Sequence, residues 1–523
     1  DRLPFRRVDG RRHRGDSGAH KKAREVVFSP RPDKPHVLTS EMLAAATKTQ
    51  YGSSASVLLN EMTAENGRDI ALQKRYALQL AMLSSFITPF MISAVNVALP
   101  TIAEEFGMTV VALSWVATAY LLSAAAFLVP FGRIADIRGR KRIFLAGMWV
   151  FLIATALCCV APSSATLIAF RYLQGVGGAM VFGTSIAILT SVYPASERGK
   201  ALGLSVSLTY VGLSLGPSLG GLMTGSLGWR SIFAATIPLM LALIWLASVR
   251  LRGEWCSGCG ERFDPQGAIM YVLSLTGVIV GFSLLPRPAG LASTVAGGLL
   301  LMAFVLWELK HPSPVLDMAL FARNRPFALS NLAALINYSA TFAVAFMVSL
   351  YLQYVRGYTP EATGFVLVSQ TVVMAAFSPL AGRLSDLVEP RVIASTGMLI
   401  TAIGLAMIAL FGTTSSVWTI VAVLSFLGFG FALFSSPNTN AIMSAVDRRQ
   451  YGVASASVGT MRMVGQVLSL GIATVFLAVY VGSVKMTPEL APEFMEAFRP
   501  AFLTFSALCL LGVLASMARG RVR

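Results

Sequence analysis

Long apolar runs recur along the chain after Arg75, and each is long enough to cross a lipid bilayer as a helix. A helix needs about 20 mainly apolar residues to span the hydrocarbon core. The runs are continuous, whereas the strands of a porin-like barrel alternate over about 10 residues, so a barrel is excluded. The pattern therefore predicts an all-α polytopic membrane protein.

Fourteen runs qualify as transmembrane helices. The run at 292–307 is short, and those at 326–354 and 450–482 are long enough to tilt or to extend past the lipid. The predicted spans are 76–100, 110–131, 143–161, 165–191, 200–225, 230–249, 267–286, 292–307, 326–354, 362–381, 392–411, 416–437, 450–482 and 499–518.

The composition of the chain excludes a water-soluble fold. Hydrophobic residues make up 55% of the 523 residues and charged residues only 13%, whereas an average soluble domain has about 25% charged residues. The polar side chains are too few to cover a soluble surface.

The chain has no Walker A sequence, no HExxH and no plausible GxSxG nucleophile elbow. We therefore expect neither an enzymatic activity nor a bound cofactor.

The 42 Lys and Arg residues outnumber the 25 Asp and Glu residues, which gives a formal charge of +17. Such a balance often indicates nucleic-acid binding, but in membrane proteins Lys and Arg gather in cytoplasmic loops. With the N-terminus inside, 20 of them fall in cytoplasmic loops and the C-terminal tail, and 5 in external loops. The charges predict a multi-pass protein of the cytoplasmic membrane with both termini cytoplasmic. Its partner is the lipid bilayer and not nucleic acid.

A short repeat divides the spans into two groups. Gly132-Arg-Ile-Ala-Asp136 ends the second span, and Gly382-Arg-Leu-Ser-Asp386 ends the tenth. We expect an N-terminal six-helix bundle over 76–249, a linker with two extra transmembrane helices over 250–325, and a C-terminal six-helix bundle over 326–518. Paired halves around a shared site are typical of transporters.

Both ends of the chain are predicted to be cytoplasmic tails. Residues 1–75 carry 15 basic and 9 acidic residues, and we expect a disordered basic tail there. Residues 1–61 alternatively represent upstream sequence read from a mis-set start, with Met62 as the true start. Residues 519–523 form the second tail.

The segment Gly132-Arg-Ile-Ala-Asp-Ile-Arg-Gly-Arg-Lys-Arg142 lies between the second and third spans, and we call it the latch. Its two glycines permit a close approach and a tight turn, and its carboxylate is placed to pair with a basic residue or a helix N-terminus. A plain stop-transfer cluster is the simpler alternative, but the acidic residue and its echo at Asp386 favour a conformational latch. The latch residues are Gly132, Arg133, Asp136, Gly139, Arg140, Lys141 and Arg142.

The fifth span contains Gly212-Leu-Ser-Leu-Gly-Pro-Ser-Leu-Gly-Gly221. Gly212, Gly216 and Gly220 recur every four residues, so they lie on one helix face and allow close packing. Pro217 removes a backbone donor and can bend the helix. The motif residues are Gly212, Gly216, Pro217, Gly220 and Gly221.

The latch resembles the signature loop of the major facilitator superfamily, and the glycine-rich span resembles its antiporter motif. Further segments are similar to the fourteen-helix drug:proton antiporter branch of the multidrug efflux type; these are Asn96-Val-Ala-Leu-Pro100, Arg171-Tyr-Leu-Gln-Gly175, Gly228-Trp-Arg230 and Ser436-Pro-Asn-Thr-Asn440. The resemblance implies two six-helix bundles with two inserted helices, a small-molecule substrate, and a proton gradient rather than a cofactor as the drive.

The sequence departs from that branch in its acidic residues. The branch usually carries a carboxylate in its first helix, five residues before the asparagine of the Asn96-Val-Ala-Leu-Pro100 motif. At that position the chain has Met91. None of the predicted spans contains an acidic residue or a histidine, although a proton carrier needs a titratable group within reach of the site. The remaining candidates are Asp136, Asp386, Glu104 and Glu105.

Two arginines, Arg171 and Arg462, lie within the predicted spans. A buried arginine is costly unless it faces water, a partner or the bundle interior. Both are therefore candidates for the transport cavity, with a structural bridge to backbone carbonyls as the alternative. Gln174 lies on the same helix face as Arg171, and Gln466 lies on the same helix face as Arg462.

Other polar and aromatic residues in the spans are candidates for ligand contact, with helix–helix hydrogen bonding or interfacial anchoring as the stronger alternative. Trp115 and Tyr120 are placed to stack on an aromatic ligand. The CxxC pair Cys256 and Cys259 has no second CxxC and no neighbouring histidine, so an ordinary loop is favoured over a metal or redox site. The remaining candidates are Asn96, Asn331, Asn337, Tyr338 and Gln370.

The sequence and the resemblance together predict a secondary active exporter of small amphipathic, drug-like compounds. We expect it to work by proton antiport with alternating access, and as a monomer. Two cavity arginines without an acid favour an anionic or zwitterionic metabolite as an alternative substrate. A membrane sensor or assembly partner that has lost transport is the alternative of another class.

Overall fold

The computed structural model describes residues 52–194, 197–447, 451–482 and 484–520, and its main elements there are helices. The chain divides into two units, Asp1–Ile70 and Ala71–Arg523. The predictions for residues 1–51 and 521–523 lie outside the described residues. Residues 52–75, which we expected in a disordered tail, are helical.

The helices follow one another with short connections. In chain order they are α3 (Gly52–Phe106), α4 (Val110–Arg138), α5 (Arg140–Cys159), α6 (Ser164–Val192), α7 (Arg198–Leu227), α8 (Arg230–Trp245) with a π-helical turn η1 (Leu246–Arg250), α9 (Pro265–Leu284), α10 (Pro288–Glu308), α11 (Met318–Arg323), α12 (Arg325–Thr341), α13 (Ala343–Leu350) with a π-helical turn η2 (Tyr351–Val355), α14 (Pro360–Leu387), α15 (Pro390–Ile408), α16 (Val417–Ser444), α17 (Tyr451–Tyr480), a 3₁₀ turn η4 (Pro488–Leu490) and α18 (Ala491–Ala518).

The prediction of fourteen spans is confirmed, because the described residues contain 14 helices that are long and apolar enough to cross a membrane. The short span at 292–307 lengthens to Pro288–Glu308. The long span at 326–354 is broken near Phe342, between α12 and α13. There the amide of Ala343 donates to Ser469 Oγ at 2.9 Å. This amide is therefore not part of the regular backbone hydrogen bonding of its own helix.

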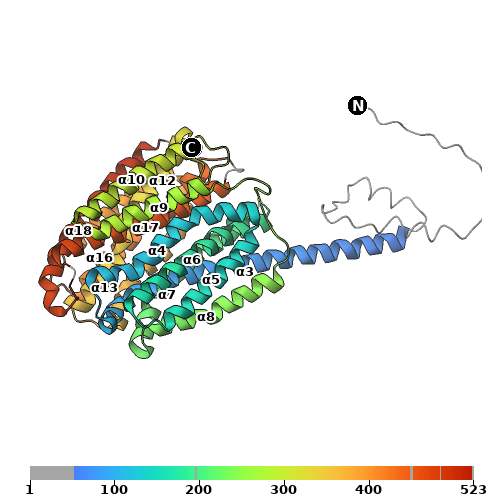
Figure 1. The fold of residues 1–523 in the computed structure, drawn as a ribbon. Coiled ribbons are helices and arrows are strands. Elements are labelled where there is room, and N and C mark those ends of the chain that lie inside the picture. The colour runs from blue at the N-terminus through green and yellow to red at the C-terminus, as the bar shows by residue number, and fades with distance from the viewer. Residues whose placement is uncertain (1–51, 195–196, 448–450, 483, 521–523) are drawn as a thin grey trace, which may run out of the picture. The chain divides into compact units, whose positions relative to one another are not determined.

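Two groups of six spans are arranged as predicted, with α3–α8 in the first, α12–α18 in the second, and α9 and α10 between them in sequence. Figure 1 shows the helices of the unit Ala71–Arg523 running side by side. Between the groups, α7 packs on α14 and α4 packs on α17, while α9 contacts both α4 and α17. The α9–α10 pair is thus attached to both bundles.

Burial differs greatly between spans. In an apolar 18-residue window of each span, 83% of the residues are buried in the span Asp69–Phe106 of α3, but only 17% in α10. The first is a central helix, and the second exposes an apolar surface of the kind that lipid covers. We call the end of the helices at which α4 ends and α5 begins the motif end, and the other the opposite end.

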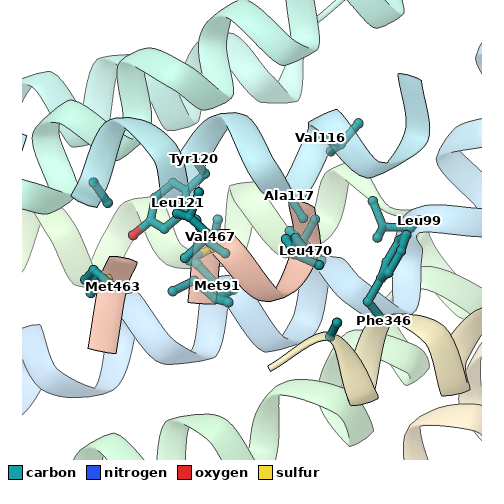
Figure 2. Close-up of a cluster of buried hydrophobic side chains, with 14 of the residues drawn as sticks. Met91, Leu99, Val116, Ala117, Tyr120, Leu121, Phe346, Met463, Val467 and Leu470 are labelled. Carbon is teal, nitrogen blue, oxygen red and sulfur yellow. The ribbon is translucent and has the colours of Figure 1, made fainter. Parts of the chain in front are cut away.

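The two bundles meet through apolar side chains in the half nearer the opposite end. Met91 of α3 is fully buried in the same cluster as Phe346 of α13 and Val467 of α17. Figure 2 shows Met91 next to Val467, and Phe346 farther along next to Leu99. Gln353 Nε2 also donates to the carbonyl of Val97 at 3.0 Å, and the amide of Val110 to that of Val484. The bundles are therefore joined across the opposite end.

Candidate functional site

The latch folds into a helix–turn–helix joint at the motif end. Gly139 has φ of 111°, a conformation that other residues rarely adopt, and it separates α4 from α5. Asp136 Oδ1 accepts two hydrogen bonds from Arg140, at 2.8 Å from Nε and 2.6 Å from Nη2. Arg140 Nη1 also donates to Ser191 Oγ at 2.6 Å and to a carbonyl of α6. The pair therefore ties α4, α5 and α6 together.

The glycines of the latch behave differently. A Cβ on Gly139 would lie 2.6 Å from the Glu254 side chain, so the predicted close approach is confirmed there. A Cβ on Gly132 would meet nothing within 4 Å. Helix α6 passes this point of α4, since a Cβ on Gly183 would lie 4.0 Å from the Gly132 Cα, but the space that a side chain on Gly132 would occupy is open.

The basic residues of the latch contact the loop Leu251–Asp264 between α8 and α9, which we call the docking loop. Arg133 Nη2 pairs with Glu261 at 2.5 Å, and Lys141 Nζ donates to the carbonyl of Leu251. Arg142 is exposed and lies 3.8 Å from a Glu254 oxygen. Among the described residues, these contacts lie within the first bundle and the docking loop. The side chain of Asp386, the echo of Asp136, lies outside the described residues.

The glycine-rich motif packs α7 against two helices. A Cβ on Gly212, Gly216 or Gly220 would lie 2.5–2.7 Å from atoms of α3, which confirms the predicted close-packing face. On another side of α7, a Cβ on Gly221 would collide with the Pro360 carbonyl of α14, and the Pro217 carbonyl lies against Gly364. The motif therefore sits where the two bundles approach each other.

Replacing Gly216 by valine is expected to destabilise the protein by about 2 kcal/mol, because a side chain there overpacks the contact with Ser93. Thermal unfolding of the purified protein in detergent measures the effect. Gly203→Ala is the matched control on α7, since a Cβ there meets nothing within 4 Å and alanine favours a helix. An equal loss of stability in both variants would contradict the packing role.

Arg171 is 1% exposed, and the partners described below belong to the first bundle. Its Nε donates to the Val116 carbonyl at 3.0 Å and its Nη1 to Gln174 Oε1 at 2.5 Å. Gln174 in turn donates to Thr155 at 2.7 Å. The guanidinium also lies 4.6 Å from the centre of the Tyr120 ring, which is fully buried. The bond to the Val116 carbonyl is the kind of contact that the structural alternative for Arg171 predicts.

Arg462 has a different environment, at the contact between the bundles. Its guanidinium lies 4.8 Å from the ring centre of Phe182 on α6, in the first bundle, and it is only half-buried. Tyr210 of α7 donates to or accepts from Ser435 of α16 at 3.0 Å, and it lies within electrostatic range of Arg462 and Tyr338. We call Phe182, Tyr210, Tyr338, Ser435 and Arg462 the central cluster.

The members of the central cluster share one level of the membrane. At 1.5 Å per residue, Tyr210 is about 18 Å from the start of α7 and Arg462 about 17 Å from the start of α17. Both helices begin at the motif end, and both bundles contribute side chains. Arg462 and Tyr338 were predicted as polar positions within spans. Tyr210, Ser435 and Phe182 were not predicted, because helices far apart in the chain bring them together.

The other predicted candidates are spread through the bundles. Asn96 and Asn337 are buried, and each has one amide atom, Oδ1 and Nδ2 respectively, without a hydrogen bond. Gln466 Oε1 is likewise buried without a partner on α17, one turn from Arg462. Trp115 packs on the apolar core, and the backbone of Gln370 packs on Gly428. Asn331 is bonded to its own helix.

The acidic candidates for proton binding do not lie in the central cluster. Glu105 accepts hydrogen bonds at the opposite end from Trp229 Nε1 at 2.6 Å and from Arg230 at 2.8 Å, so the Gly228-Trp-Arg230 motif holds it. Glu104 is exposed next to it. Met91 occupies the position of the carboxylate and is fully buried among apolar side chains.

Two buried acids were not predicted as site residues, because they lie at helix ends outside the predicted spans. Asp264 is 2% exposed, caps α9 through the amide of Gly267 and accepts from Trp307 Nε1 at 2.8 Å. Glu308, 3% exposed, accepts from the amide of Leu316 at 3.1 Å. Together they close the motif end of the α9–α10 pair.

The end of the second bundle also holds a residue that we assigned to a tail. Arg519 is 1% exposed and donates from Nη1 to Asn438 Oδ1 at 2.7 Å and to Ser330 at 3.2 Å. Burial lowers the pKa of the Arg519 guanidinium to about 10. The Ser436-Pro-Asn-Thr-Asn440 motif therefore fixes the end of α18 within the bundle.

A family model described as the Major Facilitator Superfamily matches residues 81–307 and 330–522. The chain belongs to the major facilitator superfamily. Among its relatives, the riboflavin transporter RibZ of Clostridioides difficile (strain 630) is 26% identical over 448 residues, which are 85% of this chain and 97% of that protein. The multidrug resistance protein Stp of Mycobacterium tuberculosis (strain CDC 1551 / Oshkosh) is 31% identical over 405 residues, 76% of this chain and 74% of that protein.

Among solved structures, a bacterial homologue of the human lysosomal transporter Spinster, in an inward-facing and occupied conformation, aligns with a TM-score of 0.59 and 17% identity. It covers 85% of this chain and 96% of its own, which shows the major facilitator fold. The motif-based assignment to the superfamily and its drug-efflux branch is confirmed. The chain is a multi-pass membrane transporter and not an enzyme.

Proposed function

We propose that this transporter exports small amphipathic organic compounds from the cell across the cytoplasmic membrane by alternating access. The observation that carries the proposal is the central cluster, in which both bundles contribute side chains at one level of their contact. A site between two halves is exposed to each side in turn as the halves rock. Relatives named for multidrug resistance and riboflavin transport support an organic substrate.

The motif end faces the cytoplasm in this proposal. The loops there and the C-terminal tail carry 20 Lys and Arg residues, against 5 in the loops of the opposite end, and cytoplasmic loops carry the excess of positive charge. The apolar side chains around Leu99 and Phe346 close the external side. The substrate then enters from the cytoplasm or the inner leaflet.

Inward proton movement supplies the drive. The resemblance to the drug:proton antiporter branch supports this part of the proposal, and the family match is consistent with it. No acidic residue lies in the predicted spans, which contain all the members of the central cluster. We therefore expect the proton to bind nearer the ends of the helices, where Asp136 and Glu105 are held by arginines.

A second candidate function is export of an anionic or zwitterionic metabolite. Arg462 gives the central cluster a positive group, and Met91 replaces the carboxylate that would attract a cation. A cation in the membrane interior usually needs such a counter-charge. The central cluster is therefore better suited to a substrate with a negative group next to an aromatic or apolar body.

Inside-out membrane vesicles from cells without other pumps test both proposals. We expect a pH gradient to drive uptake of an anionic or zwitterionic aromatic compound, such as fluorescein or a fluoroquinolone, and a protonophore to stop it. Uptake of ethidium alone would overturn the anion preference, and uptake that ignores the protonophore would overturn proton coupling. No uptake of any compound would overturn export and support the sensor alternative.

A further inference from the structure

The docking loop carries two exposed cysteines next to the latch. Cys256 and Cys259 are joined by a disulfide, and their Cα atoms are 5.6 Å apart, within the usual range for such a bond. Both residues are exposed, whereas Cys158 and Cys509 are buried and Cys159 is half-buried in the transmembrane helices. An aqueous redox partner therefore reaches Cys256 and Cys259 before the other three.

The residues between these two cysteines hold the latch. The amides of Ser257 and Gly258 both donate to the carbonyl of Asp136, at 3.1 and 3.0 Å. Ser257 Oγ accepts from Arg140 Nη2 at 3.0 Å. The end of α4 and the Asp136–Arg140 pair are thus bonded to a four-residue ring that the disulfide closes.

Residues outside the ring extend the same contact. Glu254 accepts from the amides of Lys141 at 2.7 Å and Arg142 at 3.2 Å, so its carboxylate binds the N-terminus of α5. The amide of Arg140 donates to the Trp255 carbonyl at 2.8 Å. The docking loop therefore binds both helices of the latch joint.

We propose that Cys256 and Cys259 are a thiol–disulfide modification site that clamps the latch when oxidised. Two thiols lose two protons and two electrons to a low-molecular-weight disulfide, which leaves as two thiols, and one S–S bond forms between the cysteines. Closing the ring limits the conformations of the undocked loop and so favours the docked one. The described residues contain no group of three His, Cys, Asp or Glu side chains suited to a metal ion.

The consequence for transport rests on the proposed export function. The docking loop leads into α9, which packs on α4 of the first bundle and on α17 of the second. A clamped latch therefore ties the joint of the first bundle to a helix that contacts both bundles, and it opposes their relative movement. Oxidation should slow export, and reduction should restore it.

Hydrogen–deuterium exchange of the full chain in nanodiscs tests the clamp without any substrate. One sample is equilibrated with oxidised glutathione and the other with dithiothreitol, and thiol labelling followed by mass measurement reports the state of Cys256 and Cys259. We expect the amides of Lys141, Ser257 and Gly258 to exchange about tenfold more slowly after oxidation. Equal exchange in the two states, or thiols that stay reduced, would overturn the proposal.

Two variants serve as controls. Cys256→Ser combined with Cys259→Ser removes the bond and should show the faster exchange of the reduced protein under both conditions. Glu254→Ala keeps both thiols but removes the acceptor for Lys141 and Arg142, so exchange at these amides should be fast even after oxidation. A redox response that persists in the double serine variant would assign the effect to another cysteine.

Flux measurements then separate this proposal from the export function. In the vesicles described above, we expect oxidation to slow fluoroquinolone uptake about tenfold in the natural protein and to leave the double serine variant unchanged. Uptake that is equal or faster after oxidation would overturn the clamp, while export itself would stand. An exchange difference without any uptake would support the modification site and overturn export.

Discussion

Replacement of Asp136 by asparagine is expected to reduce export to less than about a tenth of the natural rate, while the protein still inserts into the membrane. Asp136 Oδ1 accepts two hydrogen bonds from Arg140, and bonds between charged groups are stronger than those to a neutral amide. The variant keeps the shape of the side chain and the bond from its backbone carbonyl to the docking loop. It therefore weakens only the charged pair at the joint of α4 and α5.

The measurement is substrate uptake by inside-out vesicles, normalised to the amount of folded protein. Asp317→Asn is the matched control, because Asp317 caps the short helix α11 and asparagine caps a helix equally well. We expect this control to export normally. Normal export by the Asp136 variant would show that the charge of the latch is not needed, and it would leave the plain stop-transfer cluster as the better interpretation.

Most of the fold could be predicted because lipid imposes a simple requirement on length and hydropathy. All fourteen spans follow from it, and the paired motifs at Asp136 and Asp386 indicate the second helix of each bundle. The break near Phe342 could not be predicted, since its cause is a hydrogen bond to Ser469, more than a hundred residues away. Hydropathy does not report such contacts.

The candidate site was less predictable, because its geometry depends on which helices meet. Arg171 and Arg462 look alike in sequence, each followed on its helix face by a glutamine, yet one lies inside a bundle and the other between bundles. Cys256 and Cys259 form an unremarkable pair in the sequence, and only the fold brings the residues between them to Asp136. Short motifs identify such residues but not their partners.

The two intramembrane arginines give the second large expected effect. Arg462→Ala should reduce export of an anionic substrate at least about tenfold with little change in thermal stability, because the guanidinium is half-buried and contacts the face of Phe182. Arg462→Lys keeps the charge and should retain part of the activity. Arg287→Ala, an exposed arginine in the loop before α10, is the matched control and should export normally.

Arg171→Ala should lower the stability of the protein, whereas Arg462→Ala should lower its export. The Arg171 variant leaves the Val116 carbonyl and Gln174 Oε1 without their donor inside the first bundle, and loss of hydrogen bonds to a buried charge costs about 3 kcal/mol. We therefore expect a clear fall in melting temperature and a loss of export in proportion to the loss of folded protein. If Arg171→Ala instead kept its stability and lost export per folded molecule, Arg171 would belong to the transport site. If Arg462→Ala were the unstable variant, the central cluster would be a structural contact.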